Sequence, residues 1–191
     1  MNREFRIQKL KDQSGFTLIE MLVVVVILGI LAMIIVPQIS TSTSDAELRT
    51  MQTNLSTIRS AIEMYAAQHK NQYPGMKMND NSDTETLNAA DARTAFLAQM
   101  TLYSNAKGET ATTKDPDNYP YGPYLKLGPN TLPENPFKTG ATAVPGDVVV
   151  DFAQDDLAAA STGRAVSGDA GWQYYLKLGI FFPNDADHLN E

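Results

Sequence analysis

The chain has 191 residues, a formal net charge of −7 and no cysteine. The absence of cysteine excludes disulfides, thiolate metal sites and thiol nucleophiles. The two histidines, His69 and His188, are far apart in sequence, and a net negative charge disfavours broad binding to nucleic-acid phosphates. We therefore expect neither an enzyme nor a nucleic-acid-binding protein.

The N-terminus combines a short basic segment with a long apolar one. Basic side chains outnumber acidic ones in residues 1–15. The apolar run Phe16–Val36 would form a helix about 31 Å long, close to the hydrocarbon thickness of a bilayer, and is longer than the apolar region of a typical cleaved secretory signal. Because basic residues stay on the cytoplasmic side, we predict a single-pass anchor with its N-terminus in the cytoplasm. The body after Ser40 would then lie on the far side of the membrane.

Glu20 is the only charged residue in the apolar run. A carboxylate inside a membrane helix costs on the order of 2.5–3.5 kcal/mol on insertion scales, and such residues usually have a partner and a function. The alternative is that Glu20 lies near the interface and only reaches toward water.

The sequence GFTLIEMLVVVVILGILAMIIVP, from Gly15 to Pro37, resembles the N-terminus of type IV pilins and of the pseudopilins of type II secretion systems. The resemblance implies that a prepilin peptidase cleaves between Gly15 and Phe16 and that the new N-terminal Phe16 is N-methylated. The resemblance also implies that the membrane is the bacterial inner membrane and that the body is periplasmic. The mature chain would keep its apolar helix and enter a helical filament.

Glu20 and the two helix-breaking residues acquire possible roles from this resemblance. In a helix, Glu20 would lie one turn from the amine of Phe16, and the amine of one subunit could pair with the carboxylate of another in a low-dielectric setting. Gly29 and Pro37 imply a stretch that loses helical order in some filaments. A packing glycine and a proline kink would explain the two residues equally well.

The chain after Pro37 predicts an α+β body of pilin-like type. A helix continuing to about Lys70 has its apolar residues on one face, at Leu48, Met51, Leu55, Ile58, Ile62 and Tyr65. A second helix is predicted over 83–103 and a proline-rich connecting loop over 104–146, with a short helical turn at Tyr124–Leu127. The aromatic residues of this loop would pin it to the body, or alternatively bind a peptide or glycan.

Strand-forming residues are concentrated near the C-terminus. We predict strands at 147–153, 172–176 and 180–183 in a small antiparallel sheet, with a mobile loop before the last two. The predicted domains are a leader (1–15), a transmembrane or filament-core helix (16–38), the periplasmic half of the long helix (39–72) and the globular body (73–191).

A second, shorter resemblance narrows the family to the major pseudopilins. Tyr124-Leu125 followed by Pro133-Glu134-Asn135-Pro136-Phe137 is similar to a segment of these proteins, although Phe137 stands where tryptophan is more usual. Their C-terminal calcium loop is not legible here, and scattered surface carboxylates are the ordinary explanation for the acidic residues. No cofactor is expected, with calcium kept as a possibility. The carboxylates available to it are Asp151, Asp155, Asp156, Asp169, Asp185 and Asp187, of which Asp155, Asp156 and Asp169 are the candidates.

The function predicted from the sequence is structural. The chain would be a subunit of a secretion pseudopilus, with a type IV pilus for adhesion, motility or DNA uptake as the alternative. Implied partners are copies of itself, other pilin-like subunits, the prepilin peptidase, an inner-membrane assembly platform and, before assembly, lipid. The filament would be periplasmic or at the cell surface. A binding domain on a plain anchor would leave Glu20 unexplained.

Overall fold

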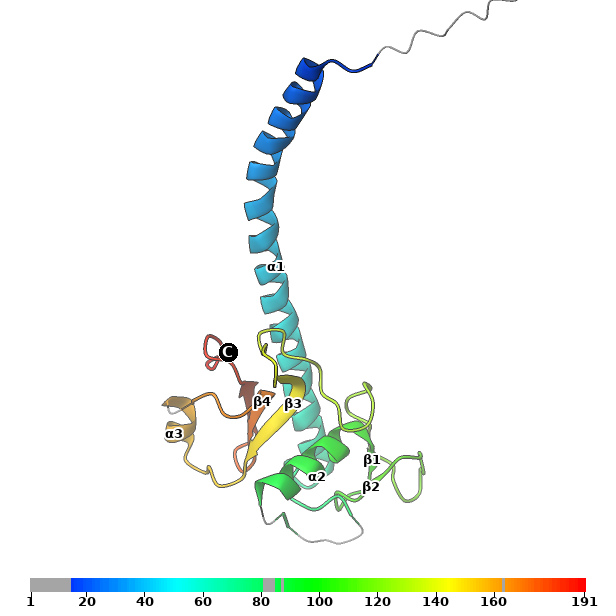
Figure 1. The fold of residues 1–191 in the computed structure, drawn as a ribbon. Helices are drawn as coiled ribbons and strands as arrows, with labels where there is room; N and C mark the ends of the chain where they lie inside the picture. The colour runs from blue at the N-terminus through cyan, green and yellow to red at the C-terminus, as the bar shows by residue number, and fades with distance from the viewer. Residues whose placement is uncertain (1–14, 81–84, 87, 163) are drawn as a thin grey trace, which may run out of the picture. The chain divides into compact units, whose positions relative to one another are not determined.

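The computed structural model describes residues 15–80, 85–86, 88–162 and 164–191, without the side chains of residues 34–42. The chain divides into two compact units, Met1–Ser44 and Asp45–Glu191. The first element, α1 (Leu18–Gln68), contributes residues to both units (Figure 1). The leader predicted over 1–15 lies outside the described residues except for Gly15.

The body, Asp45–Glu191, is built on the second half of α1. The apolar face predicted for this helix is confirmed, since Met51, Ile58 and Ile62 are essentially inaccessible to solvent. These side chains share one core with α2 (Ala89–Thr101) and the strands near the C-terminus. The part of α1 from Asp45 onward thus belongs to the same compact unit as the rest of the body.

The second helix is shorter than predicted. The prediction over 83–103 is wrong at both ends, because α2 begins at Ala89 and Tyr103 belongs to β1 (Tyr103–Ser104). The Asn88 side chain fixes the start by accepting hydrogen bonds from the backbone N–H groups of Ala90 and Asp91, both at 3.0 Å. Within this helix, the apolar side chains of Phe96, Leu97 and Met100 are buried.

Three strands form the main sheet in the order β3-β4-β5. They are β3 (Val144–Asp151), β4 (Ala170–Tyr175) and β5 (Ile180–Pro183). The hairpin of β4 and β5 is antiparallel, as predicted, but β3 runs parallel to β4. The prediction of a wholly antiparallel sheet is therefore wrong, because the connection from β3 to β4 is a crossover, which parallel pairing requires.

The crossover lies in the segment for which a mobile loop is predicted, and the structure places a short helix there. It contains α3 (Leu157–Thr162), whose first turn is capped by the carboxylate of Asp156. At its end, the backbones of β3 and β4 approach so closely that a Cβ on Gly171 would lie 2.0 Å from the Pro145 carbonyl oxygen. Only glycine fits this position without moving a strand.

The proline-rich segment follows β2 (Thr110–Ala111), which pairs with β1. The predicted helical turn at Tyr124–Leu127 is wrong, because these residues form bends only. Leu125 and Leu132 are buried, and the indole N–H of Trp172 donates to the Pro133 carbonyl at 2.8 Å. The segment thus packs on the core, as the structural interpretation of its apolar residues predicted.

His69 lies buried just beyond the end of α1. Its ring stacks on Tyr65 with centroids 3.7 Å apart. Nδ1 donates to the Tyr65 carbonyl at 2.8 Å, since a carbonyl can only accept, and Nε2 is left to accept from the Ser104 hydroxyl at 3.2 Å. Burial lowers the pKa of His69, with the hydrogen bond to Tyr65 opposing that shift.

This lowered pKa predicts acid sensitivity of the body. Near pH 6.5, the ordinary value, the unfolded chain binds a proton that folded His69 does not. The contribution of neutral His69 to the free energy of unfolding should be complete above pH 6.5. It should be lost progressively as the pH falls from there toward the pKa of His69 in the folded chain. Urea unfolding followed by Trp172 fluorescence at several pH values would measure this. His69→Gln should flatten the dependence, whereas His188→Gln should leave the His69 part intact. Equal slopes for wild type and His69→Gln would contradict it.

Candidate functional site

The N-terminal candidate site begins where α1 begins. Leu18 is the first helical residue, so Thr17 is the N-cap and Glu20 is the third helical residue. The Thr17 backbone N–H and hydroxyl both donate to Glu20 Oε2 at 2.7 Å. In return, the Glu20 backbone N–H donates to Thr17 Oγ1 at 3.3 Å. These reciprocal bonds form a capping box.

The capping box gives Glu20 a partner within its own chain. A carboxylate in the first turn also interacts favourably with the positive end of the helix dipole. Glu20 is therefore not an unpartnered charge in this structure. The Thr-x-x-Glu spacing of Thr17 and Glu20 is a legible sequence signal for this cap, which the sequence analysis missed.

The predicted processing residues lie beside this cap. Gly15, Phe16, Thr17 and Glu20 line one open hollow of about 340 Å³. Phe16 precedes α1, so the expected one-turn helical relation between Phe16 and Glu20 is not formed in this uncleaved chain. The structure nevertheless brings together the three residues that the sequence singled out at this end.

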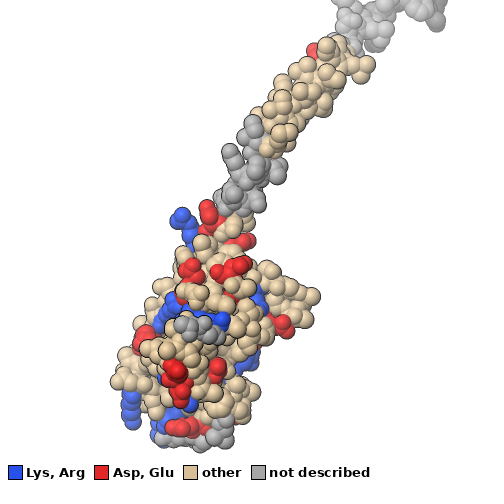
Figure 2. Space-filling model, turned by 90° about the vertical axis from the view of Figure 1, so that its left-hand side faces the viewer, with Lys and Arg blue, Asp and Glu red and all other residues tan. Residues whose placement is uncertain are grey.

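Large apolar side chains surround the first half of α1 and are exposed in this single chain. Phe16 is 81% exposed and Leu18 is 92% exposed. Glu20 is the only charged residue between Phe16 and Ser44, and the described surface of this unit is almost entirely without charge (Figure 2). Within the described residues, no helix offers an apolar stretch long enough to traverse a bilayer.

Gly29 and Pro37 both lie inside α1, which is assigned as one helix from Leu18 to Gln68. Proline lacks one backbone donor, but a helix can continue on its other hydrogen bonds. A Cβ at Gly29 would meet nothing within 4 Å in the single chain. The helix interruption expected at these residues concerns an assembled filament, and it stays a prediction.

Residues 10–36 match the family model of the prokaryotic N-terminal methylation motif. The processing signature read at Gly15 and Phe16 falls inside this match. The motif covers only the start of the chain, so it says nothing about the body.

Several curated relatives are named type II secretion system core protein G. The protein from Pseudomonas aeruginosa is 47% identical over 55 residues, which cover 29% of this chain and 39% of the relative. That from Pectobacterium carotovorum subsp. carotovorum is 28% identical over 127 residues, covering 66% of this chain and 64% of the relative. The Dickeya chrysanthemi protein is 29% identical over a segment of the same length, with 65% of the relative covered. These matches confirm the predicted resemblance to secretion pseudopilins.

The similarity does not extend over whole proteins. The chain spans about two fifths of the length of the Pseudomonas relative and just under two thirds of the Pectobacterium relative. No solved structure matches the chain.

Each of the three calcium candidates of the body has a different partner in the structure. Asp155 lies 3.6 Å from the Lys177 ammonium, Asp156 caps α3, and Asp169 accepts from the Thr142 hydroxyl at 2.9 Å. Within the part of the chain that is described, no three His, Asp or Glu side chains form a cluster suited to a metal ion.

The capping box can be tested in the uncleaved chain held in detergent micelles. Thr17→Val removes the hydroxyl that bonds Glu20 in both directions, whereas Thr17→Ser retains it. Loss of an N-cap costs about 1 kcal/mol, so amide hydrogen exchange in the first turn of α1 should be roughly fivefold faster in the valine variant. The serine variant should resemble wild type, and equal exchange in both variants would count against the cap.

Proposed function

We propose that the chain is a structural subunit of a helical filament, the pseudopilus of a type II secretion system. The match of residues 10–36 to the N-terminal methylation motif supports this proposal, as do relatives named as core proteins of that system. The observation that carries it is Glu20 in the first turn of α1, whose first half carries large apolar side chains that are exposed in the single chain.

In this proposal, processing converts the N-terminus into an assembly contact. Hydrolysis of the Gly15–Phe16 bond by a prepilin peptidase releases residues 1–15 and leaves a positive amine on Phe16, which is then methylated. That amine would compete with Thr17 for the Glu20 carboxylate, or would pair with Glu20 of a neighbouring subunit. An ion pair between subunits sets their axial register, because a displaced subunit would leave both charges unpaired in an apolar environment.

The apolar helix would have two successive environments. Before assembly it would lie in lipid as a single-pass anchor of the inner membrane, with the basic leader cytoplasmic and the body periplasmic. During assembly a membrane platform would transfer it into the filament, where identical helices replace lipid. Repetition of one head-to-tail contact produces an open helical polymer.

A type IV pilus subunit would use the same N-terminus. The names of the relatives favour secretion, and the missing cysteine agrees with that preference because many pilins close a C-terminal loop with a disulfide. The proposed role is structural, and no catalytic residue is assigned.

Mass spectrometry of the mature protein tests the processing step. The chain would be produced with and without a prepilin peptidase, and its N-terminus would be sequenced. We expect a chain that begins at N-methylated Phe16 only when the peptidase is present. A chain that retains the leader, or that is cut beyond Pro37, would overturn the proposal. Electron microscopy of sheared cells would then distinguish surface pili from a short periplasmic filament.

The Glu20 contact is tested by substitution. Glu20→Ala should leave membrane insertion and cleavage intact but reduce filament formation to background, since the Phe16 amine loses its partner in the neighbouring subunit. Asp45→Ala provides a control, because it removes an exposed carboxylate from the body part of the same helix. Normal filaments from Glu20→Ala would refute the assigned role.

A further inference from the structure

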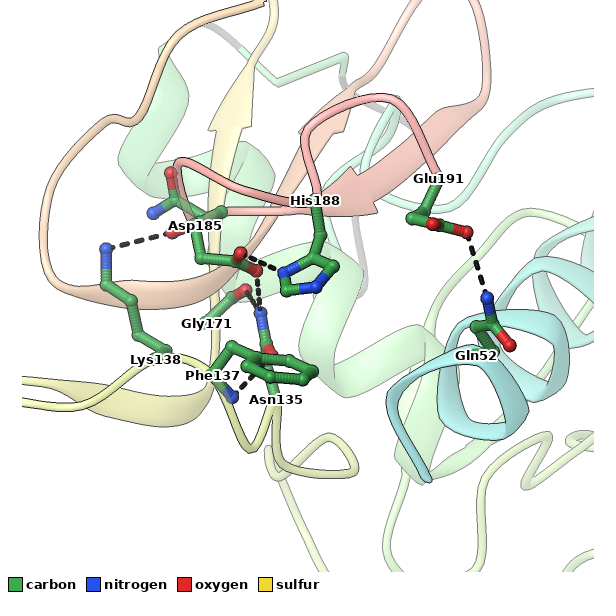
Figure 3. Close-up of polar contacts among 9 residues, drawn as sticks. Gln52, Asn135, Phe137, Lys138, Gly171, Asp185, His188 and Glu191 are labelled. Carbon is green, nitrogen blue, oxygen red and sulfur yellow. Dashed lines mark hydrogen bonds and ion pairs between the residues drawn. The ribbon is translucent and has the colours of Figure 1, made fainter. Parts of the chain in front are cut away.

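Three loops of the body meet at one buried polar junction (Figure 3). The first contains Asn135, the second runs into β4, and the third follows β5. Asn135 is fully buried, and its side-chain N–H group donates to the Gly171 carbonyl at 2.9 Å and to Asp185 Oδ2 at 3.0 Å. The Asn135 amide therefore links the first loop both to β4 and to the third loop.

Asn184 fastens the second loop to the third. Its side-chain N–H group donates to the carbonyls of Ser167 and Ala170, both at 2.6 Å. Its side-chain oxygen accepts from the Ser167 backbone N–H at 2.8 Å and from the Gln173 amide at 2.5 Å. Buried side chains with this many partners specify one arrangement of the loops.

Lys138 brings a positive charge to this junction (Figure 3). Its Nζ donates to the Gly168 carbonyl at 2.9 Å and to the Asn184 carbonyl at 3.1 Å. The lysine comes from the first loop, and the two carbonyls belong to the second and third. One ammonium thus joins all three segments through charge-assisted hydrogen bonds.

The same oxygens do not suit a calcium ion. Calcium takes about six to eight oxygen ligands, but the two carbonyls already bind an ammonium. The Asp185 carboxylate is also engaged, because Oδ2 accepts from Asn135 and Oδ1 from His188 Nδ1. His188 is further held by its ring contact with Phe137, with centroids 4.1 Å apart. A divalent cation would have to displace a positive charge and break these bonds.

We propose that Lys138 is the internal cation that closes the C-terminal loops, and that the body holds these loops without calcium. Because the ammonium is covalently part of the chain, closure needs no free ion and does not vary with the divalent cation concentration around the protein. Closure of these loops is a property of the body alone and does not depend on filament assembly.

Thermal unfolding of the full chain in detergent tests this directly. Melting of wild type would be followed by Trp172 fluorescence with millimolar calcium and again with a chelator. We expect the same Tm in both. Lys138→Met should lower the Tm by roughly 3–10 °C, because it leaves two carbonyls without their charged donor. Lys126→Met, a substitution of an exposed lysine in the same proline-rich segment, should leave the Tm unchanged.

Two outcomes would overturn the proposal. The first is a wild-type Tm that rises with calcium and falls with the chelator, a measurement that needs no variant to fold. The second is a Lys138→Met protein whose Tm equals that of Lys126→Met. Lys138→Arg retains the positive charge and its donors. It should therefore recover part of the Tm that Lys138→Met loses.

Discussion

The body of this protein depends on the burial of one face of α1 beneath α2 and the sheet. Met51, Ile58 and Ile62 are the central contacts from the helix, and Phe96, Trp172 and Phe181 meet them from the other elements. Burial of apolar area is the dominant favourable contribution to folding. An isolated small sheet would be marginally stable in water, so its strands are held by the helix as much as by their own hydrogen bonds.

This construction places the polar residues of the body at its loop junctions. The proline-rich segment is fixed by backbone hydrogen bonds, such as that of the Leu132 N–H to the Gly146 carbonyl. It is also fixed by side chains such as Asn135 and by the Trp172 indole. Lys138 contributes a fixed charge to the same place. Because buried polar groups without partners are costly, these contacts favour one arrangement of the loops.

The N-terminal unit has the opposite character. Its large apolar side chains are exposed in the single chain, and an exposed apolar surface of this kind is typical of a site that contacts another protein or a membrane. Glu20 is the one charged residue of this apolar surface. In the single chain, its carboxylate accepts hydrogen bonds from the Thr17 cap. In the proposed filament, the Phe16 amine of a neighbouring subunit would take the place of Thr17 at the Glu20 carboxylate. An intermolecular contact would then replace the internal hydrogen bonds.

Local sequence signals determined a large part of this account. The spacing of Met51, Ile58 and Ile62 predicted the buried helical face, and β-branched and aromatic runs predicted β3, β4 and β5, because both patterns depend on near neighbours in the chain. The methylation motif likewise follows from consecutive residues around Phe16. The Thr17–Glu20 cap was equally local and could have been predicted.

Only the tertiary structure decided which distant groups became partners. Strand composition does not encode direction, so the parallel pairing of β3 with β4 came from the crossover that contains α3. The neutral state of His69 depends on burial against β1, and the contacts of Lys138 depend on carbonyls from two other loops. A sequence lists the side chains that can bond, but long-range packing determines which of them meet.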